Sequence, residues 1–148
     1  MRQESQTAAV HMTLIEKVLF LQNVELLSAL SPEQLGRIAL ITAEVEMATG
    51  AILLREGELS ACMYVIVSGR VSVESGGELV FTAGEKDVIG TWALLDNEPM
   101  VVTATVVENS RVLKIDRDDF YDLLADHSEI TQSMFQVLVR RIRRLIEE

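Results

Sequence analysis

The sequence predicts a mainly β fold with helices at both ends. Between residues 43 and 115, short apolar stretches are separated by glycines or polar turns, roughly every eight to twelve residues, a spacing typical of antiparallel sandwiches and barrels. Helical periodicity is confined to the segments before and after this region. Strands do not alternate with long helices, so a parallel α/β sheet is disfavoured. A chain of 148 residues has room for one such domain.

The segment before the strands predicts two helices within residues 13–42. Residues 1–12 form a tail, either native or a cloning remnant with the natural start at Met12. An apolar stripe begins after Thr13 and predicts the first helix. Ser31 is a suitable N-cap for the second helix, with Pro32 at the first helical position and Gln34 three residues after the cap.

Eight strands are predicted between residues 43 and 115. The AEVEMA segment alternates apolar and polar side chains, which indicates a half-buried strand. Glycines punctuate most of the boundaries between the segments. In chain order the candidate strands are AEVEMA, AILL, CMYVIV, RVSVE, ELVF, VIG, TATVVE and RVLKI.

Two helices are predicted over residues 116–148. Asp116 can cap the first of them, and Ser128 can cap a final helix from Glu129 to Glu148. The middle of the final helix is apolar nearly all round, so it requires burial on two sides. One side can cover the barrel, and the other needs a partner, most simply the same helix of a second chain. The residues assigned to that dimer helix are Met134, Phe135, Leu138, Val139 and Ile142.

Composition and charge narrow the possible partners. Hydrophobic residues make up 49% of the chain, which is enough to bury a core and excludes disorder. The net charge is −10, and an acidic body repels phosphate backbones, so nucleic-acid binding is not expected. The exception is the basic run between Arg140 and Arg144, interpreted as a solvated helix end in preference to an anion site.

No targeting, membrane or catalytic signal is found in the sequence. No apolar run is long enough to span a bilayer, and the N-terminus lacks a secretory pattern. A single cysteine, Cys62, suits a reducing cytoplasm, and its apolar neighbours indicate a small core residue, not a reactive thiol. Metal-binding and nucleophile motifs are missing, so neither an enzyme nor a metal site is expected.

Three spaced segments resemble the cyclic nucleotide-binding domain family. They are TGAILLREGELSACMYVIVSGRVSV at 49–73, AGEKDVIGTWALLDNEP at 83–99 and RVLKIDRDDFYDLL at 111–124. The likeness covers roughly residues 13–148, and the family includes the sensor half of catabolite activator protein and the regulatory subunits of protein kinase A. It implies an eight-stranded antiparallel jelly-roll β-barrel over 43–115, N-terminal helices over 13–42 and two C-terminal helices over 116–148.

The resemblance implies a ligand cassette between two strands, and this chain departs from it at two positions. In the family a Glu takes the ribose hydroxyl and an Arg after a Pro contacts the cyclic phosphate. Thr91 stands where the Glu belongs, and Met100 stands where the Arg belongs. The interval between Arg70 and Arg111 contains no other arginine, only Lys86. The implied pocket comprises Gly90, Thr91, Trp92, Ala93, Leu94, Pro99, Met100, and Thr103 or Thr105 as the small donor.

The sequence therefore predicts a regulatory or sensor module that is not a conventional cyclic AMP binder. Cyclic AMP or cyclic GMP is the ligand that the family implies, but Thr91 and Met100 disfavour it. The alternatives are a ligandless oligomerisation or docking module, or a sensor of a different small ligand in the same pocket. Trp92 and Tyr64 are interpreted as packing residues. The opening segment also resembles modules of larger bacterial membrane or repeat proteins, so further domains of a parent protein are possible partners.

Overall fold

Two capped helices open the described part of the chain. The computed structural model describes residues 12–147, apart from the side chain of Trp92. Helix α1 (Leu14–Leu21) is capped by Thr13, a 3-10 turn η1 (Glu25–Leu27) follows, and helix α2 (Pro32–Leu40) is capped by Ser31. The predicted capping box of α2 is confirmed, because the Ser31 and Gln34 side chains each accept a hydrogen bond from the other's backbone N–H.

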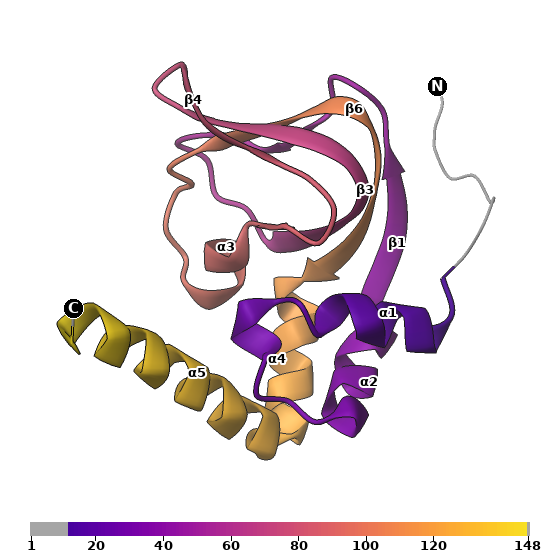
Figure 1. Ribbon diagram of the computed structural model, residues 1–148, viewed down its shortest axis with the longest axis vertical. Helices are drawn as coiled ribbons and strands as arrows, with labels where there is room; N and C mark the ends of the chain where they lie inside the picture. The colour runs from indigo at the N-terminus through magenta and orange to yellow at the C-terminus, as the bar shows by residue number, and fades with distance from the viewer. Residues whose placement is uncertain (1–11, 148) are drawn as a thin grey trace.

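The described residues form one antiparallel sheet of six strands (Figure 1). Its main path runs β1–β6–β3–β4, with β2 paired to β6 and β5 paired to β3. The sheet is strongly curved but open, because β1 and β4 lie at opposite ends of this path. The strands are β1 (Thr42–Met47), β2 (Ile52–Leu54), β3 (Cys62–Ser75), β4 (Glu78–Ala83), β5 (Val88–Ile89) and β6 (Thr103–Asp116).

The prediction of eight strands in a closed barrel is wrong in count and closure. The segments CMYVIV and RVSVE form one continuous strand, β3, and TATVVE and RVLKI form one strand, β6. Gly69, which the sequence pattern treats as a turn, instead has a φ of 108° inside β3, where the register against β6 shifts. A bulge bends a strand without ending it, so β3 and β6 curve together and stay paired.

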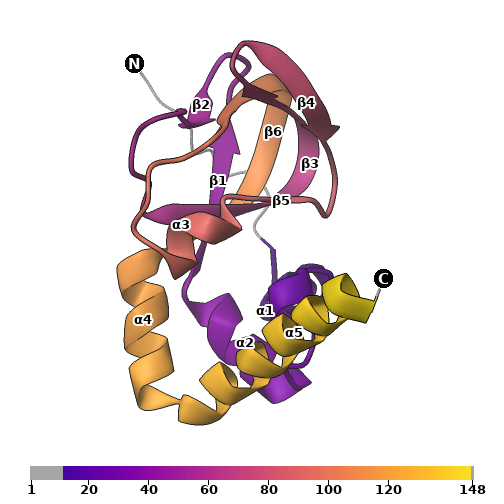
Figure 2. The same cartoon turned by 90° about the vertical axis from the view of Figure 1, so that its left-hand side faces the viewer.

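The remaining helices lie mainly at one end of the sheet (Figure 2). The short helix α3 (Thr91–Leu95) connects β5 to the loop before β6, and α4 (Arg117–Asp126) and α5 (Ser128–Glu147) end the described chain. Asp116 occupies the N-cap position of α4, but its side chain makes no capping bond. Its carboxylate accepts a hydrogen bond from the Cys62 thiol at 3.0 Å instead.

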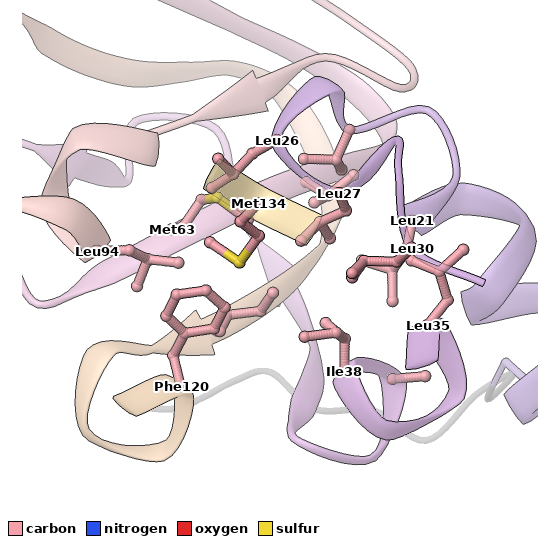
Figure 3. Packing of buried hydrophobic residues seen from close by; sticks show 14 of the residues in the cluster. Leu21, Leu26, Leu27, Leu30, Leu35, Ile38, Met63, Leu94, Phe120 and Met134 are labelled. Carbon is pink, nitrogen blue, oxygen red and sulfur yellow. The ribbon is translucent and has the colours of Figure 1, made fainter. Parts of the chain in front are cut away.

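Buried side chains gather in two clusters. The first lies where the helices meet the sheet, and Figure 3 shows residues of η1, α2, α3, α4 and α5 converging there with Met63 of β3. The second lies within the curve of the sheet and contains Tyr64, which confirms the packing role predicted for this residue. Because α3 contributes to both clusters, through Leu94 to the first and Ala93 to the second, its position is fixed from two sides.

Candidate functional site

The segment between β5 and α3 begins with a glycine that the local packing requires. Gly90 has a φ of 88°, in the left-handed region that non-glycine side chains rarely adopt. A Cβ placed there would lie 3.0 Å from the carbonyl oxygen of Cys62. The carbonyl of Gly90 accepts a hydrogen bond from the Ala93 amide at 2.9 Å. The local geometry therefore explains the glycine that the cassette resemblance identified.

Met100 is held in place by its backbone and buried through its side chain. Its amide donates to the Glu58 carbonyl, and its carbonyl accepts from the Gly57 amide, both at 2.8 Å. Its side chain is 7% exposed and belongs to the apolar cluster inside the curved sheet. The position where the family resemblance implies a phosphate-binding arginine is thus part of a hydrophobic core that also contains Val71, Val73, Ala83, Ala93 and Ala104.

The two candidate threonine donors and Pro99 occupy different surroundings. The Thr103 hydroxyl oxygen accepts a hydrogen bond from the Glu56 amide at 3.0 Å, which ties the start of β6 to the turn after β2. Thr105 lies in mid-strand, in register with Ile52 on one side and Ser72 on the other. Pro99 is exposed. The role of these three residues toward a ligand stays a prediction.

Thr91 faces a different part of the molecule from Met100. It is half-buried and lines a cavity that α3 shares with η1 and α5. Trp92 follows it in α3, and the packing role predicted for its side chain lies outside the described residues. The two positions that depart from the family pattern are therefore separated. Thr91 lies beside α5, whereas Met100 lies in the cluster within the curve of the sheet.

Arg117 is a positioning residue that sequence reasoning missed. Its guanidinium donates to the carbonyl of Ala93 at 2.8 Å, to that of Ser60 at 2.7 Å and to that of Asp96 at 3.4 Å. It thereby joins the first residue of α4 to the end of α3 and to the β2–β3 connection. The only sequence signal was a single cation among the carboxylates of DRDD, a pattern that also suits an ordinary solvated helix start.

Cys62 and Tyr64 are two residues apart at the start of β3, and the pKa of each side chain is raised. Burial is the main cause that raises the pKa of the Cys62 thiol to about 11, and its hydrogen bond to Asp116 adds to it. Burial also raises the pKa of Tyr64 to about 12. A thiol that stays protonated is a poor nucleophile, so this pair supports the structural interpretation of Cys62, although the residue is half-buried and not fully enclosed.

Helix α5 has an inner and an outer apolar face. Met134 is buried in the helix-side core, and Leu138 packs against it. Phe135, Val139 and Ile142 are exposed. Met134 and Leu138, which the sequence analysis assigned to a dimer contact, therefore pack against other residues of the same chain.

The basic end of α5 is only partly solvated. Arg141 and Arg144 both donate to the Glu25 carboxylate of η1, and these contacts hold its pKa below the ordinary value. Both arginines remain at least half exposed, so the pairing adds little stability. It links the C-terminal half of α5 to η1.

Within residues 12–147, no group of three or more His, Cys, Asp and Glu side chains is placed to hold a metal ion. No helix among them is both long and apolar enough to cross a membrane.

The chain belongs to the cyclic nucleotide-binding domain family, whose model matches residues 44–127. A CRP-like cAMP-activated global transcriptional regulator of Mycobacterium tuberculosis is 32% identical over 105 residues, which cover 68% of this chain and 47% of that protein. A cAMP-dependent protein kinase regulatory subunit of Emericella nidulans is 31% identical over 107 residues, or 71% of this chain and 26% of the relative. The chain therefore matches about half or less of these relatives' lengths.

Solved structures show the same fold. The N-terminal domain of a transcriptional regulator from Streptomyces coelicolor superposes with a TM-score of 0.80 at 24% identity, covering 85% of this chain and 94% of that one. A cyclic nucleotide-binding-like protein from Brucella abortus superposes with a TM-score of 0.67 at 26% identity, covering 74% and 97%. These likenesses confirm a mainly antiparallel fold of the family type, with the strand count corrected above.

Proposed function

We propose that residues 13–148 form a regulatory module of the cyclic nucleotide-binding fold whose cassette does not bind cyclic AMP in the conventional way. The observation that carries the proposal is Met100, an apolar side chain buried in the core at the position of the phosphate-binding arginine. Thr91 adds to it, because a hydroxyl replaces the ribose-binding carboxylate. The module has no catalytic role in this proposal and acts on other domains or on a second copy.

The free energy of the missing arginine–phosphate contact argues against binding cyclic AMP with the affinity of an ordinary family member. Removing one partner of a buried charge-assisted pair costs about 2–5 kcal/mol, which corresponds to roughly 30- to 5,000-fold in affinity at about 1.4 kcal/mol per decade. The net charge of −10 further opposes an anionic ligand. A site that is micromolar in an ordinary family member would therefore weaken toward millimolar.

The outer face of α5 supports pairing with a second copy. Phe135, Val139, Ile142 and Ile146 are all exposed, although Ile142 also borders the cavity beside α5. They are spaced four, three and four residues apart, the alternation of a two-stranded coiled-coil seam. We propose a homodimer through this face. Nucleic-acid binding is not part of the proposal, although the Mycobacterium relative is named a transcriptional regulator.

A ligandless docking module is the second candidate function, and the burial of Met100 in an apolar cluster favours it. In that case α5 would present a constant surface to its partner. In a sensor, a ligand would shift α5 only by binding two arrangements of the helix unequally. The two candidates differ in whether any small molecule stabilises the folded state, because a ligand that binds only the native state raises the unfolding midpoint.

Calorimetry with cyclic AMP and cyclic GMP tests the proposal. The parent should show no binding at about 100 micromolar nucleotide, whereas the double variant Thr91→Glu with Met100→Arg should gain measurable affinity. The matched control combines Thr82→Glu with Val101→Arg, since both residues are exposed, and should stay inert. Tight binding by the parent would overturn the proposal. If the double variant is folded but inert, the cassette geometry itself differs from the family's.

A further inference from the structure

The cavity that Thr91 borders lies between α5 and the body of the domain, apart from the apolar cluster that contains Met100. Its volume is about 600 Å³, which is within the range of pockets that hold small molecules. Four segments line it: η1 with the residues before it, the turn before β5, α3 and α5. Its apolar lining includes Leu26, Val88, Leu95, Leu138 and Leu145.

The charged groups around this cavity leave one cation without a partner. Of the two carboxylates in the lining, Glu25 is engaged by Arg141 and Arg144. The other, Asp87, accepts a hydrogen bond from the Gly84 amide at 2.8 Å. Lys86 also lines the cavity, and no described residue pairs with its ammonium group. An apolar cavity with an unpaired ammonium at its edge suits a ligand that has an apolar body and one negative charge.

The backbone of Lys86 gives an independent reason to connect it with function. Lys86 has a φ of 77° and is the only residue other than glycine with a positive φ in the described chain. Its amide donates to the Ile66 carbonyl at 2.8 Å, which holds the turn against β3. A lysine in the left-handed region costs about 1–3 kcal/mol, and residues strained in this way cluster at ligand-binding and active sites. Glycine would satisfy the turn without strain, so the strain points to a use for the ammonium.

We propose that this cavity binds a small amphipathic carboxylate, with its apolar part between Leu95 and Leu138 and its carboxylate at Lys86. Because α3 and α5 both line the cavity, a bound molecule would contact the two elements together. It would therefore favour the arrangement in which α5 lies against the body. This site is separate from the Met100 cluster and needs no cyclic nucleotide.

Calorimetry with decanoate, with 1-decanol as the neutral comparison, tests the proposal on the full chain. Decanoate should bind one to one below about 1 millimolar, and cyclic AMP should not compete with it. Lys86→Gly should relieve the backbone strain, raise the unfolding midpoint and weaken decanoate binding about tenfold. Decanol should bind this variant and the parent alike. Arg55→Gly, at an exposed turn remote from the cavity, is the matched control and should leave decanoate affinity unchanged.

A second pair of variants tests the cavity itself. Leu95→Trp should fill part of the space and weaken decanoate binding at least tenfold, whereas Leu59→Trp on an exposed loop should not. The proposal is overturned if the parent does not bind decanoate, if Leu95→Trp binds it as well as the parent, or if Lys86→Gly retains full affinity. It is also overturned if the parent does not bind decanoate and Leu95→Trp disrupts a dimer. In that case a second copy of the chain would occupy the cavity.

Discussion

Individual residues determine how closely the two long strands of the sheet approach each other. Gly69 in β3 faces Ser110 in β6, and a Cβ on Gly69 would lie 2.0 Å from the Ser110 hydroxyl oxygen and 2.6 Å from its Cα. Ser110 is itself buried, and its hydroxyl accepts from the Arg70 amide and donates to the Glu108 carbonyl. The bulge thus depends on a glycine at position 69, which has no Cβ, and on the Ser110 hydroxyl, which has hydrogen-bond partners on both sides.

Gly69→Ala should therefore be strongly destabilising. The clash includes backbone atoms that cannot rotate away, and the φ of 108° adds strain, so we expect a loss of about 3 kcal/mol or more in the free energy of unfolding. Urea denaturation measures it. Gly77→Ala, with a positive φ but nothing within 4 Å of the added Cβ, is the control and should cost only about 1–2 kcal/mol. Equal losses would show that the close approach to Ser110 is not decisive.

The thiol of Cys62 should make stability fall at alkaline pH. Its pKa is raised from 9.0 to about 11 in the folded chain, so the unfolded chain loses this proton first. The stabilisation is present below about pH 9 and is lost as the pH rises toward 11. Denaturation midpoints compared at both ends of this window should fall less for Cys62→Ala than for the parent. An identical decline in the two proteins would assign the effect to other groups.

At the scale of elements, sequence reasoning located the helices and failed on the strand count. Ser31, Pro32 and Gln34 identified the start of α2 because a capping box depends only on neighbouring residues. Gly69 and the pair Gly76–Gly77 look alike in the sequence, yet the first lies in a bulge and the pair forms a hairpin turn. What separates them is the partner strand opposite, which is more than thirty residues away and is not visible locally.

The candidate site shows the same limit. The positions Gly90, Ala93 and Met100 followed from the family pattern, and the structure gives each a packing reason. Neither Arg117 nor the cavity beside α5 could be found in this way. Arg117 acts through three carbonyl groups, which carry no sequence signature. The cavity depends on how far α5 stands from the body, which only the packed structure defines.

Arg117→Ala should loosen α3 without removing the sheet. Three carbonyl groups lose a charged donor in a half-buried setting, so we expect a loss of about 2–3 kcal/mol in the free energy of unfolding. Amide exchange should increase in α3 and at the start of α4. Arg37→Ala, on the exposed face of α2, is the comparison and should leave exchange in α3 unchanged. Unaltered exchange in the Arg117 variant would contradict a positioning role.

At the scale of the whole molecule, the outer face of α5 exposes apolar side chains that we assign to a second copy of the chain. We expect the parent to sediment as a dimer of the 16.5 kDa chain at tens of micromolar. Val139→Asp with Ile146→Asp should give a folded monomer, because both side chains are exposed on the outer face and neither lines the cavity. Val107→Asp on β6 is the exposed control. A monomeric parent would contradict the proposed pairing.

The long pairing of β3 with β6 also has a consequence for how the chain acquires its fold. The ladder joins Cys62 to Asp116 at one end and Glu74 to Thr103 at the other, so every rung spans a wide separation along the chain. Folding rates fall as contacts become less local, and a nascent β3 must wait for β6 to be synthesised. During that wait its apolar residues Met63 to Ile66, all buried in the final structure, are open to mispairing. We therefore expect slow refolding that is prone to aggregation, and a chain that depends on chaperones more than a helical domain of equal length.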